Sequence, residues 1–188
     1  MAGPNDFSER VQQCTDRFSA VGVDALGALF DLTSHRLVRF AVTLTRNQHD
    51  AEDAVQTALV RLTSQPRLLA TVACPWAYLL RMVRNEALLL ARRKQRCAPG
   101  GDLADLITHC PVDELEQEES QRAVWSALRR LAPEQAEVVV LKIWEELTFA
   151  QIGQILETSP NTVASRYQYA MAKLSKRLLN QHREVHRD

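Results

Sequence analysis

The stretch from residue 148 to residue 179 constrains the fold more than any other part of the chain. Thr148, followed by Gln151 three residues later, is typical of a capping box, and the apolar residues after it recur on one helical face. After a short break, Ser159 suits an N-cap, and Pro160 suits the first helical position because an N–H there would have no intrahelical partner. The sequence therefore predicts two helices joined by a tight turn.

The second of these helices has a polar start, a basic continuation and no acidic residue between Pro160 and Leu179. This pattern suits a helix that enters the DNA major groove, and Gly153 in the first helix indicates a close-packed partner helix. An ordinary helical hairpin with a solvated basic face is the alternative. Lys176 and Arg177, further along, are expected to hold phosphates. The candidate DNA contacts are Asn161, Thr162, Ser165, Arg166, Tyr169 and Lys173.

A second basic stripe is predicted on a long helix that Pro75 opens and that reaches about residue 95. Arginines on such a stripe hold the phosphate backbone, while a ring and an amide stack on or read an exposed base. The alternative is a solvated face whose arginines pair with acids elsewhere; Glu86 is the one acid in this stretch. The candidate residues for single-stranded DNA are Tyr78, Arg81, Arg84, Asn85, Arg92, Arg93, Lys94 and Arg96.

The preceding apolar pattern predicts one long helix ending near residue 47, either continuous or broken near Thr33. Asp50 is then expected to cap a further helix with acids in its first turn, which suits the positive end of the helix dipole. Its buried side includes Ala54 and Leu62, and its acids are expected on the exposed side.

The net charge of zero conceals an uneven distribution. Residues 1–98 hold 13 basic and 9 acidic side chains, residues 99–120 hold no basic and 7 acidic ones, and residues 121–188 hold 10 and 7. Two basic blocks therefore flank an acidic connector. Its acids serve either solubility or, as a sharper hypothesis, competition with DNA for the basic stripe.

Composition narrows the class of protein further. The N-terminus has no apolar signal core, and no apolar run approaches the length of a membrane span. The four cysteines lie far apart without metal-finger spacing. We expect a cytoplasmic protein without membrane insertion, with reduced thiols and with neither a metal site nor a cofactor.

No strand pattern and no internal repeat is present, so the predicted fold class is all-α, with two small helical domains joined by a flexible acidic linker. The expected organisation is an N-terminal tail at 1–22, a first domain at 23–97, the linker at 98–113, a second domain with the helix-turn-helix at 114–179, and a C-terminal tail at 180–188. Within the N-terminal tail, a loose helix is expected from Phe7 to Phe18.

Three segments in this order resemble the extracytoplasmic-function (group 4) sigma factors of the sigma-70 superfamily. Residues 49–62 are similar to the polymerase-binding helix of domain 2, HDAEDAVQTALVRL here. Residues 75–96 are similar to its minus-ten segment, PWAYLLRMVRNEALLLARRKQR. Residues 131–178 are similar to the minus-thirty-five reader of domain 4. The resemblance implies a promoter-specificity subunit, not an enzyme, whose partners are core RNA polymerase and promoter DNA.

The resemblance also implies roles for particular residues. A coiled coil of the largest polymerase subunits would face Asp50, Glu52, Asp53 and Gln56. An R-x-x-R-N-like pattern, whose asparagine lies near a flipped base, is matched by Arg81, Arg84 and Asn85. The T-V-x-S-R signature of the upstream reader is matched by Thr162, Ser165 and Arg166. Three departures leave the preferred promoter open: Leu89 replaces a frequent acid, Glu157 the turn glycine and Ala164 a frequent lysine.

Two other classes of function are the alternatives. A free-standing helix-turn-helix regulator would explain the C-terminal helices but gives no role to the acidic helix from Asp50. A hydrolase or metalloenzyme is not supported, because no nucleophile elbow, phosphate loop or HExxH motif occurs in the sequence. Binding of an anti-sigma factor is left open.

Overall fold

The computed structural model describes residues 4–97 and 119–185, and within these ranges every regular element is a helix. The chain divides into two compact units, Met1–Thr108 and His109–Asp188. The prediction of an all-α fold with two helical domains is thereby confirmed. The whole of the predicted linker, 98–113, lies outside the described residues, together with its acids. None of the described helices combines the length and apolar character needed to cross a bilayer.

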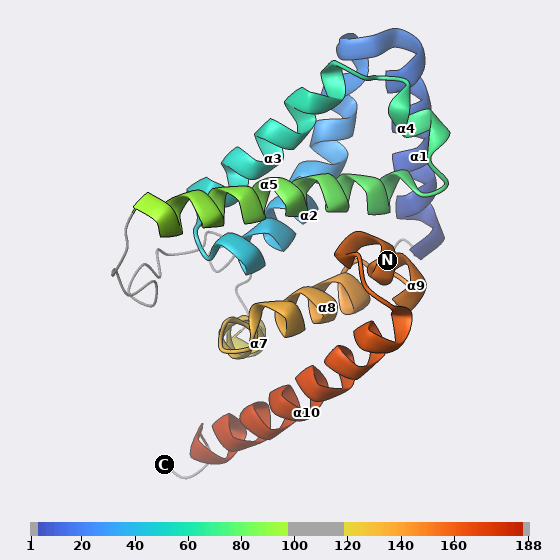
Figure 1. Ribbon diagram of the computed structural model, residues 1–188. Helices are drawn as coiled ribbons and strands as arrows, with labels where there is room; N and C mark the ends of the chain where they lie inside the picture. Colours follow the sequence, from blue (N-terminus) through green and yellow to red (C-terminus); the bar gives the residue numbers. More distant parts are fainter. Residues whose placement is uncertain (1–3, 98–118, 186–188) are drawn as a thin grey trace. The chain divides into compact units, whose positions relative to one another are not determined.

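The first unit is built around three helices that pack against one another, α2, α3 and α5 (Figure 1). Its elements are α1 (Pro4–Val21), η1 (Gly22–Ala25), α2 (Leu26–Thr45), α3 (Gln48–Thr63), α4 (Leu68–Thr71) and α5 (Pro75–Cys97). The apolar stripes of α2, α3 and α5 meet in its core, where Phe40, Val55 and Leu80 are buried. Burial of these stripes is the main favourable contribution to folding of the unit.

The N-terminal segment forms a longer and better packed helix than the loose one predicted within the tail at 1–22. Residues 4–21 form α1, which packs against α2, α4 and α5, with Val11 and Phe18 fully buried. The Ser19 hydroxyl donates a hydrogen bond of 2.9 Å to the Pro66 carbonyl oxygen. The helix is part of the first unit because its apolar residues recur at helical spacing and fill the core.

The boundary between α2 and α3 also corrects the prediction. Helix α2 continues through Thr33 without a break. The buried Thr33 hydroxyl donates a hydrogen bond of 2.6 Å to the Leu29 carbonyl oxygen, so it has a partner inside the core. Arg46 takes a left-handed conformation, with φ of 53°, that ends α2. Asn47, not Asp50, is the N-cap of α3, because its side-chain oxygen accepts from the Asp50 backbone N–H at 3.1 Å.

The second unit contains α7 (Glu119–Arg129), α8 (Pro133–Ile143), α9 (Phe149–Leu156) and α10 (Pro160–Val185). Helix α10 packs against the other three (Figure 1). Its buried stripe includes Val163, Ala170 and Leu174, which recur at helical spacing. The helix runs beyond the predicted end at residue 179, and residues 180–185 contain no proline or glycine to stop it.

The turn between α9 and α10 forms as predicted. The Thr148 hydroxyl accepts from the Gln151 N–H at 3.2 Å, and the Gln151 side chain accepts from the Thr148 N–H at 2.9 Å. The Ser159 hydroxyl accepts from the Thr162 N–H at 3.1 Å. Gly153 lies against the Thr158 carbonyl oxygen of the turn and against Pro160, the first residue of α10. The predicted close approach of a partner helix is therefore present, at the start of α10.

Candidate functional site

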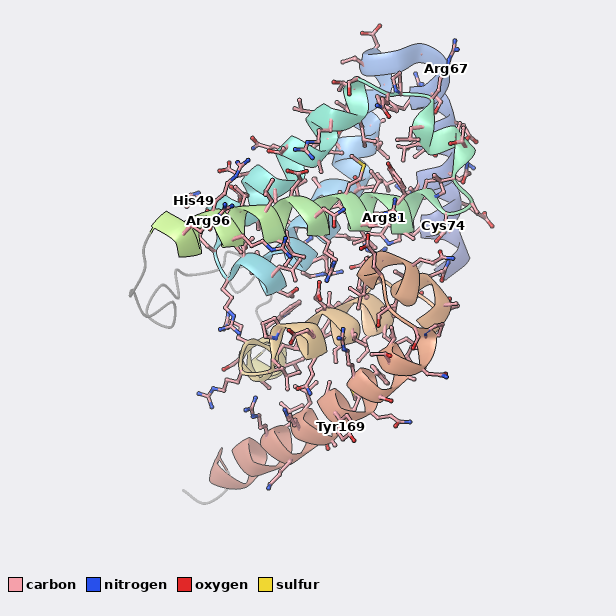
Figure 2. The ribbon with its side chains drawn as sticks, viewed as in Figure 1. His49, Arg67, Cys74, Arg81, Arg96 and Tyr169 are labelled. Carbon is pink, nitrogen blue, oxygen red and sulfur yellow. The ribbon has the colours of Figure 1, made fainter. Side chains whose placement is uncertain are left out.

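The polar face of α10 is exposed along the positions that the sequence assigns to DNA. Tyr169 has 68% of its surface exposed (Figure 2), and Arg166 is half-buried between it and the start of the helix. The other assigned residues are exposed: Asn161, Thr162, Ser165 and Lys173. Because the Tyr169 ring is largely exposed, it adds little to the core. The face therefore offers a ring, hydroxyl and amide groups, and a guanidinium, all of which can contact base edges.

Two basic residues of α10 are held by neighbouring helices. The Lys173 ammonium donates to the Gln135 side-chain oxygen on α8 at 3.0 Å. The Arg177 guanidinium donates to the Ala127 carbonyl oxygen near the end of α7 at 3.4 Å and is half-buried. Lys176, by contrast, is exposed. Arg177 therefore helps to fasten α10 to α7, whereas the sequence assigned it to phosphates.

The stripe on α5 presents an aromatic ring beside a guanidinium. The Arg81 guanidinium carbon lies 5.3 Å from the Tyr78 ring centroid. Arg81 is exposed (Figure 2), and so is Asn85 one turn further along the helix. Such a cation–π contact orients the arginine while leaving its N–H groups available. Further along the helix, Arg92, Arg93 and Arg96 are exposed, and Arg84 is half-buried.

Glu86, the acid within α5, is directed away from this stripe. Its carboxylate forms an ion pair with Arg61 of α3, and its side chain is 7% exposed. The acid therefore neutralises a residue of α3. The exposed arginines of the stripe keep their positive field, which favours phosphate binding over the alternative of a self-paired surface.

Lys94 does not share the face of the other α5 candidates. At helical spacing it continues the line of Val83 and Ala87, which are fully buried, and it reaches α3. Its ammonium nitrogen lies 2.7 Å from a carboxylate oxygen of Asp50. The structure thus brings together one residue assigned to promoter DNA and one assigned to polymerase.

The acidic helix α3 divides its candidates between two environments. Asp53 and Gln56 are exposed, whereas Glu52 is half-buried and accepts a 2.7 Å hydrogen bond from Gln48. Val60 lies one and two turns beyond Gln56 and Asp53 on the same face and is 67% exposed. Sequence reasoning did not single out this valine, although its offset from the buried stripe was a usable signal.

Among the residues that the structure describes, no group of three or more His, Cys, Asp or Glu side chains is placed to hold a metal ion. The candidate binding surfaces in the described residues are the exposed faces of α3, α5 and α10.

Comparison with known proteins identifies two family regions. Residues 29–97 match the family model described as Sigma-70 region 2, and residues 121–174 match Sigma-70, region 4. An RNA polymerase sigma-E factor of Streptomyces avermitilis is 34% identical over 144 residues, which cover 76% of this chain and 78% of the relative. The ECF RNA polymerase sigma factor SigM of Mycobacterium tuberculosis is 32% identical over 155 residues, covering 82% of this chain and 77% of the relative.

The fold has solved counterparts. A sigma factor RpoE from Bartonella quintana, crystallised with the anti-sigma factor NepR, superimposes with a TM-score of 0.68 at 22% identity. That match covers 79% of this chain and 93% of the other. CnrH, in complex with the cytosolic domain of CnrY, gives a TM-score of 0.62 at 21% identity, covering 90% of this chain and 97% of the other.

Proposed function

The chain belongs to the extracytoplasmic-function group of the sigma-70 family, and we propose that it serves promoter-directed transcription initiation through three separate surfaces on α3, α5 and α10. Its partners are core RNA polymerase and promoter DNA. Sigma factors as a class are not enzymes, and in our proposal this chain likewise acts by binding alone.

The polymerase surface in this proposal is the exposed face of α3 formed by Asp53, Gln56 and Val60. An acid and an amide beside an exposed apolar side chain suit a basic partner helix with an apolar contact at its centre. Asp50 and Glu52 are left out of this face because each is held by a neighbouring side chain. The face is the observation that carries the proposal, since a free-standing regulator has no use for it.

The promoter surfaces are the stripe on α5 and the polar face of α10. On α5, Tyr78, Arg81 and Asn85 would trap an unpaired base of the minus-ten element, and the arginines further along would hold its phosphates. Flipping a base costs a few kcal/mol of stacking and pairing, which a stacking ring and hydrogen bonds can offset. On α10, the first turns would read the minus-thirty-five element in the major groove.

The division into domains follows from the same proposal. We assign minus-ten and polymerase binding to the first domain, now including α1, and minus-thirty-five binding to the second. An anti-sigma factor is a further candidate partner, because the structurally similar RpoE was solved in complex with the anti-sigma factor NepR. Such a partner would inhibit by covering one of the three surfaces.

The test uses the full-length chain and purified core polymerase. Asp53→Arg combined with Gln56→Ala should weaken the affinity for core polymerase and abolish run-off transcription from a pool of promoter fragments, with helicity unchanged. Asp31→Arg is the matched control, because Asp31 is an exposed acid on α2, outside the proposed face. Wild-type core affinity in the double variant would contradict the assignment. DNA binding without any transcription by the wild-type chain would favour the free-standing regulator.

A further inference from the structure

The ion pair between Asp50 and Lys94 joins two helices with different proposed tasks. Asp50 stands in the first turn of α3, and Lys94 stands in the last turn of α5. Their charged atoms are 2.7 Å apart, and the side chains are 15% and 58% exposed, respectively. In Figure 2 the neighbouring residues His49 and Arg96 lie at the same end of the first unit, as this pair requires.

The last turns of α5 extend beyond the core of the first unit. Ala87 is fully buried, the residues from 88 to 91 are half-buried, and Arg92, Arg93 and Arg96 are exposed. Among the described side chains of residues 92–96, Lys94 is the one with a polar contact to another helix. Like charges at this end repel one another, so a tie to α3 opposes fraying of the α5 terminus.

The acid that forms this tie is itself held in place. The Asp50 backbone N–H donates to the Asn47 cap, and the next residue, Ala51, is fully buried against the core. The backbone that carries the carboxylate is therefore already fixed, so pairing with Lys94 costs only the rotational freedom of the two side chains. An ion pair with a mostly buried partner is worth more than one between two solvated side chains.

We infer that Asp50 is a positioning residue for promoter binding and not a polymerase contact. It acts through Lys94, which holds the end of α5 so that Arg92, Arg93 and Arg96 present their charges in a fixed arrangement to the DNA backbone. Binding to a pre-arranged cluster costs less conformational entropy than binding to a fraying helix end. The inference rests on the proposed function for its minus-ten surface and reassigns one residue of the polymerase surface that the family resemblance implied.

Three explanations of Asp50 predict different changes in core-polymerase affinity and DNA affinity for one substitution, Asp50→Asn. If Asp50 contacted polymerase, neutralising it would lower the affinity of the chain for core polymerase. If it acted only as a charge near DNA, its removal would raise DNA affinity, because an anion beside the phosphates is lost. As a positioning residue, it should leave core affinity unchanged and lower DNA affinity.

The experiment reconstitutes holoenzyme from full-length chain and core polymerase. The probe is a fluorescent fork-junction DNA selected from a random pool by the wild-type holoenzyme. Asp50→Asn and Lys94→Gln should each lower DNA affinity about threefold to tenfold, as expected for one partly buried ion pair. The charge-swapped variant, Asp50→Lys with Lys94→Asp, restores the pair without changing the net charge and should recover most of this loss. A merely electrostatic role of Asp50 is excluded by the direction of the Asp50→Asn effect, because removing an anion near DNA would raise the affinity.

A matched control uses the other ion pair between the same helices. Arg61→Gln with Glu86→Gln removes a contact eight residues earlier on α5, inside the packed part of the helix. We expect this variant to lose stability while keeping DNA affinity within about twofold once folded. Unchanged or increased DNA affinity for Asp50→Asn, or reduced core affinity, would overturn the inference. The Asp53 and Gln56 variant tests the polymerase surface separately, so failure of one assignment does not imply failure of the other.

Discussion

The carbonyl oxygen of Thr158 lies 2.8 Å from the position that a Cβ atom would occupy on Gly153. Real Cβ atoms essentially never approach another heavy atom this closely, and the opposing atom belongs to the backbone of the turn. Gly153→Ala should therefore push α9 away from the start of α10. We expect the second unit to lose about 1–3 kcal/mol, measured by urea unfolding in a Trp76→Phe background, where fluorescence comes from Trp125 and Trp144.

The chain offers its own control for this substitution. A Cβ atom added to Gly27 on α2 would have no other heavy atom within 4 Å, so Gly27→Ala gains helix propensity without a clash. It should stabilise the first unit by about 0.5–1 kcal/mol. Equal effects of the two alanines would show that crowding at Gly153 has no energetic consequence.

Glu157 occupies a position where glycine is favoured. Its φ of 54° and ψ of 44° place it in the left-handed region at the C-terminus of α9. Glu157→Gly should relieve this strain and stabilise the second unit by about 1 kcal/mol, seen as a higher urea midpoint. Gln154→Gly, on the exposed side of the same helix, should lower the midpoint by a similar amount. A lower midpoint for Glu157→Gly would mean that the glutamate side chain stabilises the turn by more than its backbone strain costs.

Arg166 and Lys176 separate base contacts from phosphate contacts. Arg166 lies near the start of α10, the end of a recognition helix that reaches base edges, whereas Lys176 is almost three turns further along. Arg166→Ala should cost about 1–3 kcal/mol in upstream-element affinity and relax preference at one position. Lys176→Ala should weaken binding to all DNA sequences alike. Lys176 is a better control position than Arg177, because Arg177 contacts α7. An equal loss on every sequence for Arg166→Ala would require a different docking of α10.

Phe7 ties α1 to the start of α5. The Phe7 and Trp76 rings meet edge to face, with their centroids 5.0 Å apart. The Arg36 guanidinium carbon lies 3.8 Å from the Phe7 ring centroid. Phe7→Ala should destabilise the first unit by about 2 kcal/mol. Unfolding can be followed by Trp76 fluorescence in a chain whose Trp125 and Trp144 are replaced by Phe.

Two comparisons make this prediction specific. Phe7→Tyr keeps the ring and should restore most of the stability. Ser19→Ala removes one hydrogen bond at the other end of α1 and should cost about 1 kcal/mol. A stability unchanged by Phe7→Ala would mean that this end of α1 contributes nothing to the stability of the first unit.

Local interactions explain why much of this protein could be predicted from the sequence. The capping box at Thr148, the Ser159 cap and the buried stripe of α10 depend on residues within a few positions of one another. Helical periodicity likewise separated the exposed Arg81 and Asn85 from the buried Leu80 and its neighbours on α5. Such features need only the geometry of one helix, which the sequence specifies directly.

The tertiary structure alone decided which charged side chains are paired and which are available to a partner. Asp50 and Lys94 are 44 positions apart in the chain, and so their contact depends on how α3 crosses α5. The same crossing directs Arg61 to Glu86. Periodicity gives the direction of each side chain around its own helix but not the neighbour it meets, because that neighbour is set by the packing of all the helices in the unit.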